Sequence, residues 1–342
     1  MPIRPPNGPV GSASPLFRPR TREEIRKTNK LKQEKPHVFD KMKMFDHLLY
    51  LGQSIAIIRL EYNYMCNLRC GHCSIHKFQG VTDRRVLTPE DVADLSIQAD
   101  ELGLARFVVT GGEPLLFPDL DEIVEAIHPE RHYINLDTNG WFLNLPKAKH
   151  LKSIGVDRIQ LSIDSLIAAD HDAFRGKVGS HIRAMRALEA SQEADLDVFV
   201  QTVVDNKRLY SDEFREFIRF FNSLDVGVFV TFLKPVGAQS DRSGMVTRED
   251  MGHLDKMQKE GLNVFWHVTK AYGRDLGCIA VKAMVSITAF GDVNPCPYIF
   301  KPIGNIFDEP LKDILARGMK TPPFDRYIDT CPIADAEWNW DE

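Results

Sequence analysis

The six cysteines of this 342-residue chain fall into two groups of three, and the first group has the spacing of a metal-binding loop. Cys66, Cys70 and Cys73 form a C-x3-C-x2-C pattern in the sequence EYNYMCNLRCGHCSIHKF, directly after an apolar run typical of a strand. Thiolates this close together on a loop can converge on one metal centre. One interpretation is a structural zinc ion with His72 or His76 as the fourth ligand. The other is a [4Fe–4S] cluster held by three cysteines, which leaves one iron open to a ligand, and the spacing alone favours neither.

Polar or glycine residues follow three further apolar runs that we expect to be strands. The second run ends in GGEP, where two glycines allow close approach of the backbone to a ligand and the glutamate supplies a carboxylate acceptor. The third run ends in DTNG and the fourth in LSIDS. If the strands are parallel, these ends meet on one rim and line a polar, ligand-binding mouth. The residues concerned are Gly111, Gly112, Glu113, Asn139, Ser162 and Asp164.

The elements that must position these residues alternate between short β-rich runs and amphipathic helical stretches. Strands are predicted at 55–61, 106–110, 133–137, 158–163, 197–204 and 227–232. Helices are predicted between them at 89–102, 120–127, 145–152, 181–191 and 212–222. This alternation favours parallel pairing through right-handed crossovers, either in a doubly wound sheet or in an incomplete β/α barrel. In both folds, ligands bind beyond the carboxyl ends of the strands.

With these motifs in this order, the sequence resembles the radical S-adenosylmethionine (SAM) enzymes over about residues 58–235, more than half of the chain. The matching elements are the C-x3-C-x2-C loop, GGEP, DTNG, and SIDS followed by DAFRG. The resemblance implies an α/β fold, a partial (β/α)6 barrel. It also implies reductive cleavage of SAM to a 5′-deoxyadenosyl radical that abstracts hydrogen from a substrate, with flavodoxin or ferredoxin as the electron donor.

The same resemblance assigns roles to the residues of the motifs. Cys66, Cys70 and Cys73 would bind the [4Fe–4S] cluster, and SAM would chelate its open iron. Gly111, Gly112 and Glu113 would contact the SAM amino group, and His72 would pack on the adenine. Asn139, Ser162 and Asp164 would face the ribose or the methionine end, and Arg175 would pair with the SAM carboxylate. For Arg175 a plain surface salt bridge is an equal alternative.

The second group of cysteines is Cys278, Cys296 and Cys331, with Cys296 in the sequence TAFGDVNPCPYIF. This part resembles the auxiliary-cluster domain of many radical SAM enzymes, in its short twitch form rather than the longer SPASM form, and so implies a second iron–sulfur cluster. Such domains commonly end in C-x2-C, whereas Ala334 stands where the last cysteine would be. Three alternatives follow: a cluster with an open iron, a cluster completed by another side chain such as Asp329 or Asp335, or no second cluster, with Cys331 as a hydrogen-atom donor.

We expect three regions in the chain. Residues 1–53 form a Pro-rich, basic arm that is solvated and contains at most one short helix. Residues 54–235 form the radical SAM core. Residues 236–342 form a smaller α+β domain with a helix near 247–260, a hairpin at 285–289 and 293–298, and a short helix at 310–317.

The predicted function is a radical SAM oxidoreductase that acts on a small polar substrate, such as a sugar, aminocyclitol or nucleoside, by net two-electron oxidation. The alternatives are a redox-neutral epimerase, mutase or lyase, a peptide-modifying maturase, and a zinc-stabilised binding protein without catalytic activity. A net charge of −5 gives no general attraction to nucleic acid or anionic lipid, and no 18 apolar residues follow one another. We therefore expect a soluble, cytoplasmic protein with no nucleic-acid or membrane partner.

Overall fold

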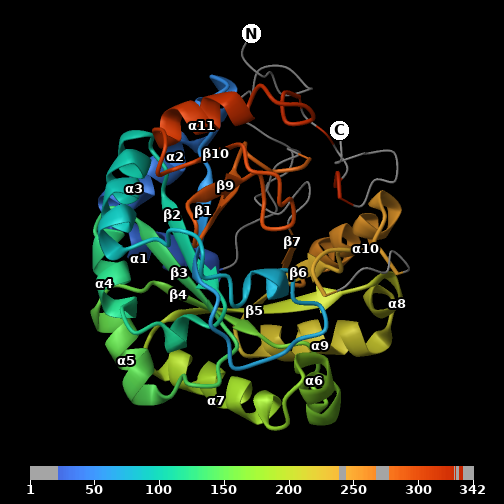
Figure 1. The fold of residues 1–342 in the computed structure, drawn as a ribbon. Helices are drawn as coiled ribbons and strands as arrows, with labels where there is room; N and C mark the ends of the chain where they lie inside the picture. Colours follow the sequence, from blue (N-terminus) through green and yellow to red (C-terminus); the bar gives the residue numbers. More distant parts are fainter. Residues whose placement is uncertain (1–21, 239–243, 267–276, 327, 329–330, 334–342) are drawn as a thin grey trace.

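The computed structural model describes residues 22–238, 244–266, 277–326, 328 and 331–333, and Figure 1 shows the arrangement of the elements. In these residues one ten-stranded sheet has the order β10-β9-β8-β1-β2-β3-β4-β5-β6-β7. The strands are β1 (Ile57–Asn63), β2 (Arg106–Gly111), β3 (Tyr133–Thr138), β4 (Arg158–Ser162), β5 (Asp197–Val204), β6 (Gly227–Phe232), β7 (Val264–Trp266), β8 (Met284–Thr288), β9 (Asp292–Asn294) and β10 (Gly304–Asn305). Every neighbouring pair from β8 through β1 to β7 is parallel, and the pairs β8–β9 and β9–β10 are antiparallel.

Helices follow the parallel strands and cover the outside of the curved sheet (Figure 1). Their bounds are α3 (Pro89–Glu101), α4 (Leu120–Ala126), α5 (Leu145–Ser153), α6 (Ala168–Arg175), α7 (Ser180–Glu193), α8 (Asn206–Leu209), α9 (Asp212–Ser223), α10 (Arg248–Lys259) and α11 (Leu311–Gly318). Helix α9 shows why such segments fold here: Ser211 caps its first turn, and Phe214, Phe217 and Phe221 form one fully buried stripe. The predicted partial β/α barrel is therefore confirmed.

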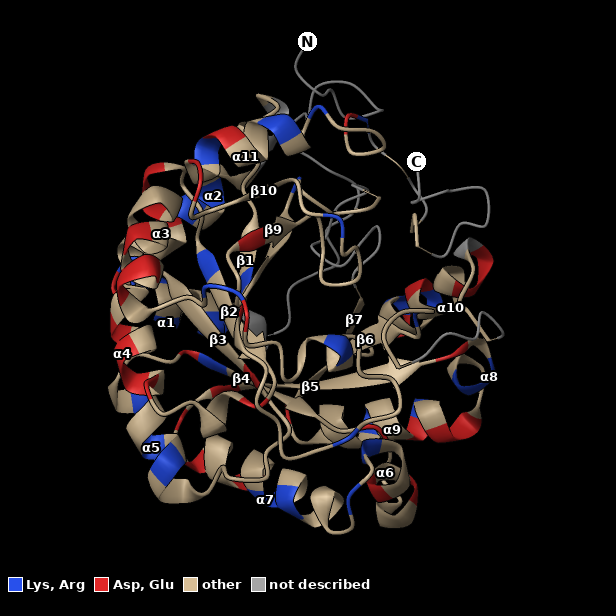
Figure 2. Ribbon diagram, viewed as in Figure 1, with Lys and Arg blue, Asp and Glu red and all other residues tan. Residues whose placement is uncertain are grey.

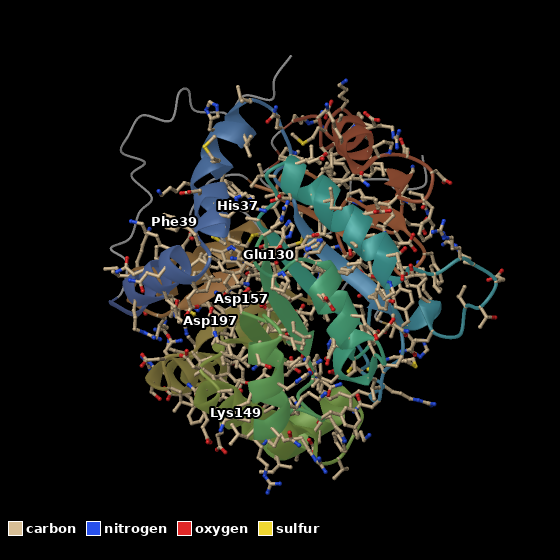
Figure 3. All side chains as sticks on the ribbon, turned by 90° about the vertical axis from the view of Figure 1, so that its left-hand side faces the viewer. His37, Phe39, Glu130, Lys149, Asp157 and Asp197 are labelled. Carbon is tan, nitrogen blue, oxygen red and sulfur yellow. The ribbon has the colours of Figure 1, made fainter. Side chains whose placement is uncertain are left out.

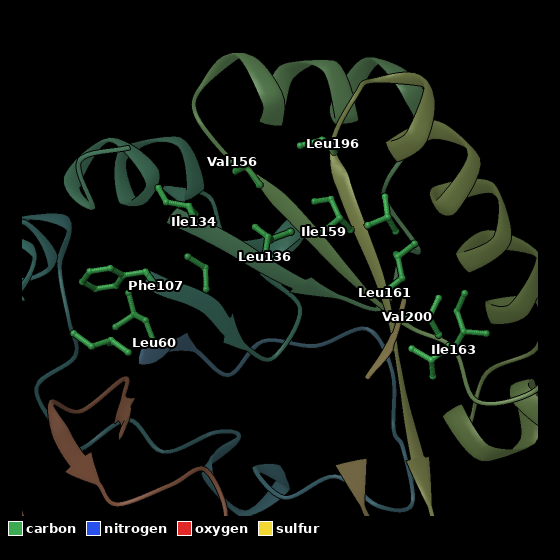
Figure 4. Close-up of a cluster of buried hydrophobic side chains, with 14 of the residues drawn as sticks. Leu60, Phe107, Ile134, Leu136, Val156, Ile159, Leu161, Ile163, Leu196 and Val200 are labelled. Atoms are coloured by element: carbon green, nitrogen blue, oxygen red, sulfur yellow. The ribbon is translucent and has the colours of Figure 1, made fainter. Parts of the chain in front are cut away.

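The core lies between the strands and these outer helices. Phe107, Ile134, Ile159 and Val200, each from a different strand, are fully buried and lie in the cluster drawn in Figure 4. Charged residues, by contrast, lie mainly on the outer helices (Figure 2). Hydrophobic burial between the strands and the outer helices therefore stabilises the sheet, and polar groups can lie at the carboxyl ends of the strands.

The N-terminal segment differs from the predicted solvated arm, because its described part forms two helices, α1 (Arg22–Glu34) and α2 (Pro36–Tyr50). The ammonium group of Lys35 pairs with Asp157 at 2.5 Å and also donates to the carbonyl of His132 at 3.1 Å. Lys27 pairs with Asp197 at 2.5 Å, and Figure 3 shows Asp157 and Asp197 beside these helices. The basic residues that suggested solvation thus bind acidic residues far along the chain. Residues 1–21 of the arm lie outside the described residues.

The predicted hairpin is present as β8 and β9, and it joins the barrel sheet directly. Strand β8 pairs in parallel with β1, with Ile58 opposite Val285. Helix α11 lies against α3, where the backbone N–H of Leu311 donates to the side chain of Gln98 at 2.8 Å. None of the helices in the described part of the chain is long and apolar enough to cross a membrane.

Candidate active site at the carboxyl end of the barrel

The first three cysteines lie in the loop after β1 and line one cavity of about 190 Å³. All three are half-buried, and burial raises the pKa of the Cys66 thiol to about 11. Among the described residues, no three His, Cys, Asp or Glu side chains are gathered closely enough to hold a single metal ion. The residues that fit an iron–sulfur cluster here are the three thiols of Cys66, Cys70 and Cys73, because all three face the same cavity.

The GGEP segment packs its backbone directly against the cysteine loop. The N–H of Gly112 donates to the carbonyl of Asn63, and the N–H of Glu113 donates to the carbonyl of Met65, both at 2.7 Å. A Cβ atom on Gly111 would lie 2.2 Å from the Asn63 oxygen, and one on Gly112 would lie 1.9 Å from the Met65 oxygen. Close contact with the cysteine loop thus requires both glycines, and both also line the cavity.

Glu113 is buried and joins the ends of β2 and β3. Its carboxylate accepts from the hydroxyl of Thr138 and from the backbone N–H groups of Asn139 at 2.8 Å and Leu115 at 3.2 Å. Burial raises the pKa of Glu113 to about 7, although these hydrogen bonds oppose the shift. Both carboxylate oxygens accept hydrogen bonds from the protein, so Glu113 holds the ends of β2 and β3 together in addition to any contact with SAM.

We expect Glu113→Gln to change how stability depends on pH. Because the folded-state pKa of Glu113 is raised, its contribution to stability is fully present below the ordinary pKa of about 4.5 and is lost as the pH rises through about 7. Glutamine is neutral at both values, so the variant should lose less stability than wild type between pH 5 and pH 8. Thermal unfolding at the two pH values measures this difference. The exposed Glu130→Gln variant is the control, and equal slopes for Glu113→Gln and wild type would contradict the prediction.

Asn139 connects the DTNG segment to the cysteine loop. Its side-chain amide donates to the Asn67 side chain at 2.9 Å, and its carbonyl oxygen accepts from the N–H of Trp141 at 2.9 Å. Asn67 directly follows Cys66. Asn139 therefore lines the cavity and supports the loop that carries the thiols.

Arg175 and Asp164 form a buried ion pair, which excludes the alternative of a surface salt bridge. Their side chains are 9% and 5% exposed, and Nε of Arg175 donates to Asp164 at 2.6 Å. Arg175 also approaches the sulfur of Cys70 at 4.0 Å, and it lines the cavity. The carboxylate of Asp164 accepts a further bond from the N–H of Val203 at 3.0 Å, so it acts on the cavity through Arg175. Although burial opposes it, the charge of Arg175 holds the pKa of Asp164 below its usual value.

His72 and Ser162, to which the resemblance assigned contacts with SAM, both line the cavity. The ring of His72 stacks on Phe174 with centroids 4.4 Å apart. Burial, aided by the charge of Arg175, lowers the pKa of His72 to about 4, so its imidazole is neutral near pH 7. A neutral, stacked ring is suited to contact with an aromatic base, so packing of His72 on the adenine of SAM stays a prediction.

Sequence analysis noted Asp137 only as part of the DTNG motif and missed the other polar groups inside the barrel. Arg59 pairs with Asp137 at 3.0 Å, and the amide of Gln201 donates to Thr231 at 3.1 Å. These four residues line the cavity together with Tyr298, whose pKa is raised to about 12 by burial. The available signal was a charged residue within an apolar strand, as at Arg59 in IIRLEYN.

The second group of thiols lies in a separate apolar cluster beside the same cavity. Cys278, Cys296 and Cys331 pack in or against this cluster, and burial raises the pKa of Cys278 to about 11. The ammonium of Lys234 donates to the sulfur of Cys331 at 3.2 Å, and Lys234 lines the cavity. The fit to an auxiliary cluster again rests on three thiols brought together from distant segments. The alternative ligands Asp329 and Asp335 lie outside the described residues.

Comparisons with known proteins agree with both groups of cysteines. The model of the Radical SAM superfamily matches residues 60–221, and the SPASM model, described as an iron-sulfur cluster-binding domain, matches residues 278–331. The second match begins at Cys278 and ends at Cys331. The choice between a twitch and a SPASM form, and the domain boundary near residue 236, stay predictions.

Among curated proteins, the chain is similar to enzymes with different substrates. It is 26% identical over 299 residues to the AdoMet-dependent heme synthase of Methanosarcina barkeri, covering 78% of this chain and 84% of that one. It is 30% identical over 216 residues to the GTP 3′,8-cyclase of Aquifex aeolicus, covering 61% and 66%. It is 28% identical over 274 residues to the PqqA peptide cyclase of Streptomyces rochei, covering 75% and 74%.

Solved structures show the same fold at low identity. SuiB of Streptococcus suis, bound to its precursor peptide SuiA, matches with a TM-score of 0.63 and 18% identity, covering 88% of this chain and 70% of that one. The structure of anSMEcpe with bound AdoMet matches with a TM-score of 0.59 and 17% identity, covering 80% and 83%.

Proposed function

Since the chain belongs to the radical SAM superfamily and has a C-terminal auxiliary-cluster domain, we propose that it oxidises a small polar substrate by two electrons. Cys66, Cys70 and Cys73 would hold the first cluster, which together with SAM would supply the chemistry of hydrogen-atom abstraction by a 5′-deoxyadenosyl radical. For net oxidation the remaining electron must leave the substrate together with a proton. The auxiliary site is the proposed acceptor of that electron, and flavodoxin or ferredoxin is the proposed donor to the first cluster.

The observation that carries this proposal is the cavity itself. Its lining extends from Cys66, Cys70 and Cys73 to Lys234, which contacts Cys331, and to Tyr298, which lies two residues after Cys296. A substrate in this cavity would therefore lie between the two groups of thiols. This arrangement supports transfer of an electron from substrate to the auxiliary site.

The polar interior of the barrel supports the proposed class of substrate. Arg59, Asp137, Gln201 and Thr231 present charged and amide groups to the cavity, which suits hydroxyl or amino groups on a sugar, an aminocyclitol or a nucleoside. The similar proteins include a heme synthase, a GTP cyclase and a peptide cyclase, and so their names share no single substrate.

Peptide modification is the second candidate, and the similarity to a PqqA peptide cyclase over 75% of the chain favours it. If the reaction is redox-neutral, on a small molecule or on a peptide, Cys331 would return a hydrogen atom to the product. Deuterium from solvent at the reacting carbon would support that role for the thiol.

Iron and sulfide content with electron paramagnetic resonance on anaerobically reconstituted protein tests the proposal. We expect about eight irons in wild type and about four in the Cys66→Ala/Cys70→Ala/Cys73→Ala variant. The matched Cys278→Ala/Cys296→Ala/Cys331→Ala variant should also hold about four, on the first site. About four irons in wild type and almost none in the first variant would overturn oxidation through an auxiliary cluster.

A further inference from the structure

Two lysines flank the auxiliary group of thiols, and neither belongs to the cysteine pattern. Lys234, just after β6, reaches Cys331 at 3.2 Å from the cavity side. Lys282, just before β8, is fully buried, and its ammonium lies 6.0 Å from the ring centroid of Phe324, a residue of the apolar cluster that also contains Cys278. One cation therefore contacts a sulfur atom of this group, and a second lies against the same apolar cluster.

The backbone around Lys282 is held in an unusual conformation. Val281 has a φ of +62°, which is costly for a β-branched residue and persists only where surrounding contacts impose it. Its N–H donates to the carbonyls of Met284 at 2.8 Å and Pro295 at 3.2 Å, and Ser54 donates to its carbonyl. These contacts fix the loop that places Lys282 in the protein interior.

Thiolates on an iron–sulfur cluster carry negative charge, and an ammonium group beside their sulfur atoms makes a charge-assisted contact with them. The cluster becomes more negative by one charge when it accepts an electron, so nearby cations stabilise its reduced form more than its oxidised form. Charge and hydrogen bonds at the sulfurs are among the factors that set the potential of such clusters.

We propose that Lys234 and Lys282 are positioning residues that raise the reduction potential of the auxiliary cluster and so make it a better electron acceptor. The inference rests on the proposed function, because it requires iron at the second group of cysteines. Lys234 contacts Cys331 and also lines the cavity, so its ammonium lies between the substrate space and the cluster site.

The test uses the Cys66→Ala/Cys70→Ala/Cys73→Ala background, in which only the auxiliary site retains iron. Its midpoint potential is measured by redox titration followed by electron paramagnetic resonance, with Lys234→Met, Lys234→Arg and Lys282→Met introduced separately. The control is Lys312→Met, an exposed lysine on α11. We expect Lys234→Met to make electron uptake about tenfold less favourable, a shift of about 59 mV to lower potential for one electron. Lys234→Arg keeps the positive charge, so its midpoint potential should lie close to that of the background variant.

Each outcome separates this inference from the function it rests on. Absence of iron in the background variant overturns the proposed function, and this inference with it. With about four irons bound, an unchanged potential in Lys234→Met, or the same shift in Lys312→Met, overturns the inference alone. If Lys282→Met does not fold, the Lys234 variants still decide, because Lys234 is only half-buried.

Discussion

Gly112→Ala is expected to remove iron from the first site and to reduce SAM cleavage by about a hundredfold or more, because a misplaced reacting group loses its alignment. The new Cβ atom would lie 1.9 Å from the carbonyl oxygen of Met65 and 2.8 Å from the carbonyl carbon of Tyr64. That oxygen accepts the N–H of Glu113, so the segments cannot separate without breaking this bond. Since Cys66 follows Met65 directly, the displacement moves the first thiol.

Iron content and the rate of 5′-deoxyadenosine formation measure this effect in reconstituted protein. We expect about four of about eight irons to remain, all at the auxiliary site. Gly252→Ala on α10 is the matched control, because nothing lies within 4 Å of its new Cβ atom, and it should keep both clusters. Full iron content and normal cleavage in Gly112→Ala would show that the loop tolerates the displacement.

Periodicity was sufficient to predict six strands of the barrel sheet, but it predicted neither β7 nor the pairing of β8 with β1. Strand β5, with its alternating burial, and strand β6 have the predicted bounds. The cysteine loop was equally visible, because Cys66, Cys70 and Cys73 lie within eight residues of one another. Both signals are local, so one sequence contains all the information they require.

Contacts between distant segments account for what the sequence did not predict. The lysines of the N-terminal segment were expected to be solvated, but Lys35, between α1 and α2, binds Asp157, and Lys41 of α2 binds Asp100 at 2.9 Å. Gly111 and Gly112 were expected to admit a ligand, whereas the structure shows that they also admit the backbone of Asn63 and Met65. The contact of Lys234 with Cys331 joins residues 97 positions apart, and no local pattern indicates it.

Asp164→Asn is expected to destabilise the protein by about 3 kcal/mol at pH 7 and to weaken SAM binding, because it leaves the buried charge of Arg175 without its carboxylate. The pair is 2.6 Å apart, and Arg175 would be left beside the sulfur of Cys70. Urea unfolding and equilibrium binding of SAM to reconstituted protein measure the two effects. Arg219→Met, which breaks an exposed pair with Glu216, is the control and should cost less than about 1 kcal/mol.

The pH dependence of this difference follows from the lowered pKa of Asp164. Its stabilising contribution is present above the ordinary value of about 4 and is lost as the pH falls through the lower folded-state pKa. The gap in stability between wild type and Asp164→Asn should therefore narrow below about pH 4. A gap of the same size at pH 7 and under acid would show that the ion pair is not its cause.

A double variant separates the role of the pair in folding from its role at the cavity. Asp164→Leu/Arg175→Met replaces two buried charges with apolar groups of similar size, a change that commonly restores stability lost in single variants. We expect recovered stability without recovered SAM binding, because the guanidinium of Arg175 lines the cavity and a methionine offers no donor to a carboxylate. If SAM binding returned with stability, Arg175 would serve the fold alone.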